Sequence, residues 1–467
     1  MTMRMETDSI GTLPVPIDAY YGIHSIRAYT NFPITGRVIH PYLVESIIKV
    51  KKAAALANRK AGTLEEQTAD AITAACDEIL SGKYLDQFIV DPIQGGAGTS
   101  ANMNANEVIA NRAIELLGGT KGDYRLVHPN DHVNMSQSTN DVFPTAGKLT
   151  VLVLLSKLTE QLMRLQKALE GKAHEFRDVI KTGRTQLQDA VPIRLGQSFH
   201  AYSQVVKRDI SRMDRIEADM KVMNMGGTAI GTAVNTSSVY LSNIIGILGD
   251  ITGYDLEQAE DLIDATQNLD GFVQASGLIK TCAVNLSKMS NDLRLLSSGP
   301  KAGIGEINLP MRQNGSSIMP GKVNPVIPEV VSQVAFNIIG NDTAITMAAE
   351  AGQLELNAFE PVLFYNLFES IETLTGAVQT LVDHCIAGIT ANKERCSELL
   401  ESSTAVAAAL CPRIGYGRAA KIAKLSLKTG TPVRELVIRE GTLSKMEIEA
   451  LLDPEAMTTP LDMSPLL

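Results

Sequence analysis

The sequence predicts an all-α fold organised around a bundle of long helices. Apolar residues recur every three or four positions over segments of about thirty residues, which is the periodicity of a helix with a buried face. No segment shows the alternating strand and helix patterns of a parallel α/β protein. Aromatic residues make up 4% of the chain and Trp is absent, so aliphatic side chains and Met must fill the core, which disfavours an aromatic-rich β-sandwich.

Residues 1–138 are expected to form an N-terminal domain of mixed, mainly helical structure. Five prolines between Pro14 and Pro92 interrupt this part of the chain. Between these breaks, helical segments are expected near 45–58 and 65–80.

Residues 139–393 are expected to form the central domain, a long-helix bundle. Nine apolar side chains from Val151 to Ile180 follow one another at helical spacing, which predicts one long helix. The same periodicity predicts helices over 199–223 and 278–296, and apolar segments with few breakers predict two more over 326–350 and 362–390. Helices of this length carry more apolar surface than one compact chain needs, so we expect a homo-oligomer. A monomeric bundle with a wide core is the alternative.

Residues 394–467 are expected to form a small C-terminal helical domain. Short helical segments near 395–409, 418–428, 432–440 and 444–452 are separated by glycines and a proline.

Charge and composition exclude several classes of partner. A net charge of -10 repels nucleic-acid phosphates and anionic lipid surfaces, so we expect neither nucleic acid nor membrane as a partner. Five scattered Cys without a CxxC pair are poor material for a disulfide framework and favour the reducing cytoplasm. No HExxH or Cys/His ligand spacing is present, and we expect neither a metal nor another cofactor. We also find no apolar segment typical of a signal peptide or a membrane span.

Four polar stretches interrupt the helical pattern and are the candidates for chemistry. A glycine-rich loop before a probable helix suits an anion, although ordinary helix capping is its alternative explanation. A run of polar residues after Met135 is longer than one N-cap requires. A simple turn between two helices is the alternative for the third stretch. The four stretches are residues 95–104, 134–141, 183–192 and 314–325.

The fourth stretch imitates a phosphate-binding loop from Gly315 to Lys322 without being one. Its glycines stand five residues apart instead of four, and Val323 occupies the position where Ser or Thr would hold magnesium. Ser316 could instead be held as an alkoxide by loop N–H groups and a cation, and could then act as a base or a nucleophile. None of the seven His lies in the four stretches and no Gly-x-Ser-x-Gly elbow is present, so a Ser-His-Asp hydrolase is disfavoured.

The sequence GSSIMPGKVNP at residues 315–325 resembles the signature loop of the fumarase/aspartase superfamily. The stretches GGAGTSANMN, HVNMSQSTND and GRTQLQDAVP resemble that superfamily's other active-site segments, in the right order. The resemblance covers nearly the whole chain. It implies three helical domains, a twenty-helix core formed by four chains, and active sites that are each shared between three subunits.

Within the superfamily, the chain is more similar to the aspartase branch than to class II fumarases. Fumarases typically have QSSND, GRTHLQDATP and NPTQCE where this chain has QSTND, GRTQLQDAVP and NPVIPE. Gln186 therefore replaces a His that helps fumarases to handle water or hydroxide, whereas an amine can leave already protonated. The resemblance implies reversible deamination of L-aspartate to fumarate, with a fumarate hydratase as the first alternative. A catalytically silent relative is the second, and the retained Ser–Lys loop argues against it.

The resemblance also implies a role for each candidate residue. Ser316 would be the general base that takes the C3 proton, and hydroxyls would hold the β-carboxylate as it becomes an aci-carboxylate. Those hydroxyls belong to Thr99, Ser138, Thr139 and Thr185, assisted by the signature-loop positions Gly315, Ser317 and Met319. Lys322 and Asn324 would bind the α-carboxylate, while Asn140 and Gln186 would bind the ammonium group.

Overall fold

The computed structural model describes residues 2–459 and is dominated by helices, as predicted. The chain divides into two compact units. The first comprises Met1–Thr159, Ser211–Thr281 and Phe336–Thr375, and the second comprises Glu160–Ile210, Cys282–Ala335 and Gly376–Leu467. The three-domain boundaries after residues 138 and 393 stay predictions.

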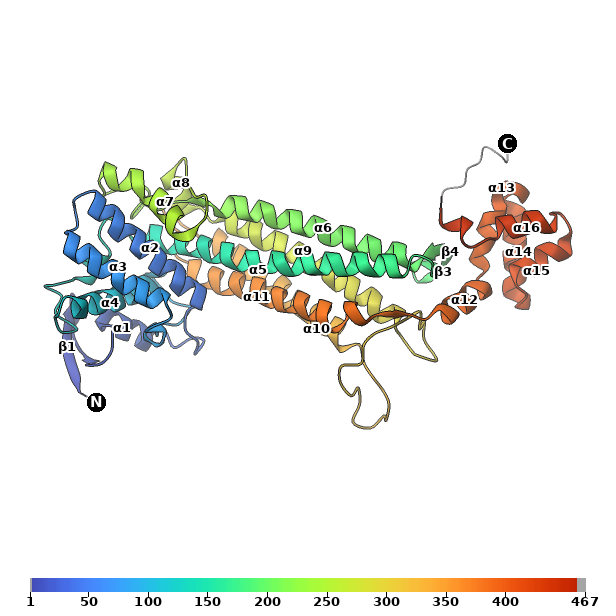
Figure 1. Ribbon diagram of the computed structural model, residues 1–467, viewed down its shortest axis with the longest axis horizontal. Coiled ribbons are helices and arrows are strands. Elements are labelled where there is room, and N and C mark those ends of the chain that lie inside the picture. The colour runs from blue at the N-terminus through green and yellow to red at the C-terminus, as the bar shows by residue number, and fades with distance from the viewer. Residues whose placement is uncertain (1, 460–467) are drawn as a thin grey trace. The chain divides into compact units, whose positions relative to one another are not determined.

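The first unit begins with a small hairpin and a group of helices (Figure 1). Helix α2 packs against α3 and α7, and α3 packs against α4. The predicted helices near 45–58 and 65–80 are α2 and α3. The elements are β1 (Met3–Asp8), β2 (Gly11–Pro16), α1 (Ile23–Asn31), α2 (Pro41–Lys60), α3 (Glu66–Leu80), η1 (Leu85–Gln87), α4 (Thr99–Leu116), η2 (Pro129–Val133), β5 (Val222–Met223), α7 (Ser238–Thr252), β6 (Glu257–Gln258) and α8 (Leu262–Gln267).

Five long helices contribute residues to both units, and they correspond to the five predicted from periodicity. They are α5 (Thr139–Glu175), α6 (Leu195–Met220), α9 (Asp270–Leu296), α10 (Val326–Glu350) and α11 (Glu360–His384). Three of the expected ends were wrong. The stripe that begins at Val151 leaves the helix after Glu175, because the β-branched Val179 and Ile180 already belong to the approach to a strand. Met223 lies in β5 instead of α6, and α11 ends at His384, six residues before the expected end.

Close contacts between bundle helices set the core of the first unit. Gly147 of α5 lies against Phe364 of α11, and a Cβ atom at Gly147 would come within 2.1 Å of that ring. The Phe364 ring also contacts Phe143 and Phe272, at centroid distances of 5.2 and 5.0 Å. Glycine is therefore required at residue 147 for α5 and α11 to approach this closely.

In the second unit, polar contacts tie the same helices together. Asn285 of α9 donates to the Asp209 carboxylate of α6 at 2.9 Å, and Arg164 of α5 pairs with Asp383 of α11 at 2.5 Å. Helix α5 is long and apolar enough to cross a membrane by length and composition, but 72% of the relevant window is buried inside the protein. We therefore assign α5 to the core of the fold.

The third polar stretch forms an antiparallel hairpin of β3 (Ile180–Thr185) and β4 (Gln188–Arg194), and the alternative of a simple helix–helix turn was wrong. A two-residue tip, Gln186 and Leu187, joins the strands with φ values of 55° and 62°. This left-handed geometry matches the twist of a hairpin, but it usually carries Asn or Gly. The missing turn signature explains why the sequence concealed the hairpin.

The end of the chain folds into the short helices that the sequence predicts. Their shared core includes Leu410, Ile422, Val437 and Ile448. The elements are α12 (Lys393–Ser402), η4 (Thr404–Leu410), α13 (Cys411–Ile414), α14 (Tyr416–Thr429), α15 (Val433–Glu440), α16 (Lys445–Leu451) and η5 (Ala456–Thr458), and the second unit also contains η3 (Ile386–Gly388) and the antiparallel pair β7 (Ile307–Asn308) and β8 (Thr390–Ala391).

Candidate active site

Thr99 is the first residue of α4 and is exposed. Its hydroxyl donates to the Gly96 carbonyl at 2.6 Å, and Gly98 caps the helix with φ 90°. A Cβ atom at Gly98 would lie 2.4 Å from the Phe143 ring of α5. The glycine-rich loop therefore lets the N-terminus of α4 pack directly on α5, with its free N–H groups beside Thr99.

The second polar stretch forms the turn into α5 and is held by a buried carboxylate. Asp141 accepts N–H groups from Ser138, Gly226 and Thr228 at 2.9 to 3.0 Å. Burial raises the pKa of Asp141 to about 6, while the three backbone hydrogen bonds favour its charged form. Asn140 donates through Nδ2 to the Ala229 carbonyl at 2.7 Å. These bonds fix the backbone that presents Ser138, Thr139 and Asn140.

An amide network links this turn to α4. Asn102 of α4 donates to Thr139 Oγ1 at 3.2 Å and to Asn134 Oδ1 at 3.1 Å. The fully buried Lys51 of α2 donates to the same Asn134 oxygen at 2.8 Å and to Gln137 Oε1 at 2.9 Å. Burial lowers the pKa of Lys51 to about 7, opposed by the Asp141 carboxylate. The first unit therefore brings the Thr99 helix and residues 138–140 into one connected network.

Thr185 and Gln186 lie at the exposed tip of the β3–β4 hairpin in the second unit. The base of this hairpin is anchored by Glu306, which is fully buried. Arg184 Nη1 donates to Glu306 Oε1 at 2.8 Å, and Lys181 Nζ lies 3.0 Å from Oε2 in an ion contact that lacks the direction of a hydrogen bond. One carboxylate thus holds two cations of β3.

The signature loop folds back on itself. Gly315 N–H donates to the Lys322 carbonyl at 2.8 Å, and Asn324 Nδ2 donates to the Gly315 carbonyl at 2.9 Å. A Cβ atom at Gly315 would lie 2.5 Å from the Lys322 carbonyl oxygen, so this closure requires glycine. Asn324 therefore has a structural partner in the loop in addition to its expected role.

Ser316 lies inside this closed turn. Its Oγ accepts backbone N–H groups from Ile318 at 3.2 Å and from Met319 at 3.0 Å. Two donors aimed at one hydroxyl oxygen favour negative charge on that oxygen. Ser317 and the Lys322 side chain are exposed.

The predicted residues thus occupy three places in one chain. Thr99 and residues 138–140 share a network in the first unit, whereas the hairpin tip and the signature loop belong to the second. Among residues 2–459, no hydrogen bond or ion pair joins the hairpin tip to the signature loop. The sequence did not reveal the supporting roles of Lys51 and Glu306, because these residues lie far along the chain from the stretches that they hold. Asp141 and Asn102 stood inside the predicted stretches without an assigned role.

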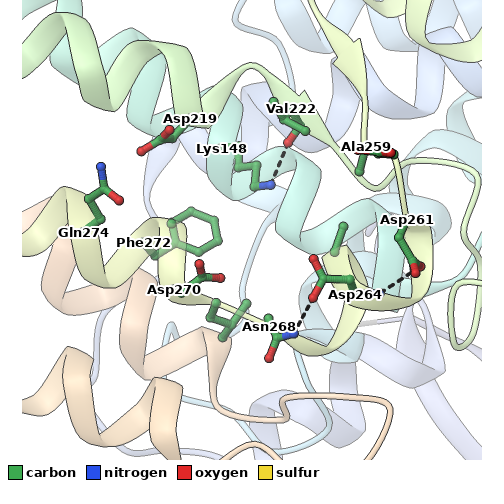
Figure 2. Close-up of a pocket in the computed structure, with 14 residues that line it drawn as sticks. Lys148, Asp219, Val222, Ala259, Asp261, Asp264, Asn268, Asp270, Phe272 and Gln274 are labelled. Atoms are coloured by element: carbon green, nitrogen blue, oxygen red, sulfur yellow. Dashed lines mark hydrogen bonds between the residues drawn. The ribbon is translucent and has the colours of Figure 1, made fainter.

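A separate cavity of about 810 Å³ in the first unit does not contain these residues (Figure 2). Its wall carries Asp219, Asp264 and Asp270, and Lys148 donates to the Val222 carbonyl at 2.6 Å. The excess of carboxylates repels anions, so this cavity does not suit a dicarboxylate.

Comparison with known proteins places these elements in context. A family model described as a lyase matches residues 11–340, and a second, described as the fumarase C C-terminus, matches residues 406–459. An aspartate ammonia-lyase of a Bacillus species is 52% identical over 458 residues, which cover 98% of each chain. The aspartate ammonia-lyase of Escherichia coli K12 is 49% identical, with 98% of this chain and 96% of that protein covered.

Solved structures agree. A Brucella melitensis structure, described as fumarate lyase:delta crystallin bound to cobalt, superposes with a TM-score of 0.96 at 51% identity, covering 98% of this chain and 100% of that chain. The recombinant class II fumarase from Schistosoma mansoni superposes with a TM-score of 0.95 at 35% identity, covering 99% of this chain and 100% of that chain.

Proposed function

This chain belongs to the fumarase/aspartase superfamily, and from that premise we propose that it is an aspartate ammonia-lyase, which converts L-aspartate reversibly to fumarate and ammonia. The observation that carries this assignment is about 50% identity, over nearly the full length, to several aspartate ammonia-lyases. The similarity to the Schistosoma fumarase is lower, at 35%. The Gln186 and Thr139 positions favour the same branch.

In the proposed reaction, Ser316 Oγ as an alkoxide takes the C3 proton of aspartate. The electron pair of the broken C–H bond moves into the β-carboxylate, which becomes a dianionic aci-carboxylate. When that charge returns, the carbon–carbon double bond forms, the C–N bond breaks and ammonia leaves with the bonding pair. The two N–H groups directed at Ser316 Oγ support this role because they stabilise its deprotonated form.

The remaining residues are assigned by charge and hydrogen-bonding capacity. Thr99, Ser138, Thr139 and Thr185 would donate to the β-carboxylate, where charge develops, together with N–H groups of the signature loop at Gly315, Ser317 and Met319. Lys322 and Asn324 would bind the α-carboxylate, and the side-chain oxygens of Asn140 and Gln186 would accept from the ammonium group. A donor placed where charge develops contributes about 3 kcal/mol to the transition state.

We further propose a cytoplasmic homotetramer whose active sites are each completed by three subunits. Two features support this assembly. One chain distributes the candidate residues over separate elements, and α10 exposes the large apolar side chains Phe336, Ile339 and Met347 at helical spacing. Their exposed fractions in the single chain are 64%, 41% and 67%, which is a costly apolar surface unless another subunit covers it.

A substrate comparison tests the activity. The purified protein is mixed with L-aspartate and, in parallel, with L-malate, while fumarate is followed by its ultraviolet absorbance and ammonia by a coupled assay. We expect fumarate from aspartate with an equal amount of ammonia. Fumarate from malate alone would identify a fumarate hydratase instead, and silence with both substrates from a folded protein would reject the lyase assignment.

A further inference from the structure

The base of the β3–β4 hairpin borders a cavity that the proposed reaction does not use. The cavity has a volume of about 350 Å³ and lies within the second unit, between the hairpin, α6 and α9. Lys181, Arg184 and Lys288 contribute cations to its wall, and Asp292 contributes a carboxylate. Thr185 and Gln186 are absent from its lining.

The charges around this cavity do not balance. Glu306 lies behind the wall and is shared by Lys181 and Arg184. Asp292 is already occupied, because Lys288 pairs with it and Tyr202 donates to it at 2.9 Å. Three cations therefore face two carboxylates, and one positive charge beside Arg184 has no counterion among these groups.

Hydrogen-bond donors remain available at the same place. The bonds of Arg184 to protein acceptors in the described chain all come from Nη1, which leaves Nε and Nη2 without a protein partner. The Arg184 side chain is 15% exposed, so these donors are largely desolvated and yet open to the cavity. A guanidinium with two free N–H edges is suited to a planar carboxylate.

The rest of the wall is apolar. Leu187 and Ile193 come from the hairpin, Leu295 and Leu296 from α9, and Ile304 from the following loop. A ligand that satisfies both parts of the wall needs one anionic group and a short hydrocarbon body.

We propose that this cavity is a binding site for a small aliphatic monocarboxylate, whose carboxylate pairs with Arg184 and whose hydrocarbon chain lies on the apolar wall. The site is separate from the proposed substrate site, because adjacent strand residues point to opposite faces and Arg184 therefore faces away from Thr185. The charge count also argues against a dianion here, since only one positive charge is unmatched.

Ala201 of α6 offers a matched test. It is an exposed helical residue on the cavity wall and has no role in the proposed reaction. Ala201→Glu places a carboxylate in the cavity, whereas Ala201→Gln occupies the same volume without charge. Ser198→Asp and Ser198→Asn, one turn earlier on the same wall, provide a second pair if the first impairs folding.

Hexanoate is the probe, and its binding to the assembled full-length protein is measured by titration calorimetry with 1-hexanol as the uncharged control. We expect saturable binding of hexanoate but not of hexanol, weakened about ten-fold by Ala201→Glu and little by Ala201→Gln. The proposal would be overturned if the wild type bound no hexanoate, if hexanol bound equally well, or if Glu and Gln had the same effect.

A parallel assay with L-aspartate keeps this test independent of the proposed function. Loss of hexanoate selectivity with intact lyase activity would reject only the carboxylate site. Retained hexanoate selectivity without lyase activity would reject only the proposed function.

Discussion

At the scale of single residues, Ser316 differs from its neighbour Ser317 in its surroundings. Ser316 Oγ receives two backbone N–H groups, whereas Ser317 is exposed. The sequence could single out Ser316 only through the resemblance, because the pattern Gly-Ser-Ser does not distinguish the two hydroxyls. The hydrogen bonds now provide a physical reason for the choice.

Ser316→Ala should lower kcat for aspartate by about 10³-fold while KM changes little, since the proposed base acts on the proton and not on substrate affinity. The matched control Ser317→Ala should keep most of the activity. Steady-state kinetics of the two variants decides the matter, and substantial turnover by Ser316→Ala would remove the base assignment.

At the scale of elements, the sequence predicted helices better than the turns that join them. Helix α10 begins and ends at the expected residues because its apolar pattern is uninterrupted. Helix α5 begins twelve residues before the stripe that revealed it, since polar residues and Pro144 hide its first turns. The hairpin was missed because Gln186 and Leu187 occupy positions where Asn or Gly would have signalled a turn.

Gly98→Ala tests the contact between the ends of α4 and α5. A methyl group there would meet the Phe143 ring and would also adopt a left-handed backbone, so we expect the free energy of unfolding to fall by about 2–4 kcal/mol. Gly118→Ala is the control, because Gly118 also has positive φ, at 81°, but its added methyl group would contact nothing within 4 Å. That variant should lose only about 1 kcal/mol. Equal losses in urea unfolding would show that the Phe143 contact contributes little.

At the scale of the whole molecule, the candidate site is incomplete in any one of the places that the chain provides. The network around residues 138–140 offers hydroxyls without a base, and the signature loop offers Ser316 and Lys322 without those hydroxyls. The sequence could predict the membership of the site because its motifs are contiguous. It could not predict the supports at Lys51 and Glu306, whose effect depends on packing between distant segments.

Complementation between two inactive variants tests the account's central claim, that residues of different chains complete each active site. Ser316→Ala and Thr139→Val proteins are unfolded, mixed in equal amounts and refolded together, and the release of fumarate from L-aspartate is compared with that of each variant refolded alone. If the two residues come from different subunits, about a quarter of the sites in mixed tetramers should carry both native side chains, so activity should rise to about a quarter of the wild-type value. Activity no higher than the mean of the two separate variants, from tetramers shown to be mixed, would contradict the shared site.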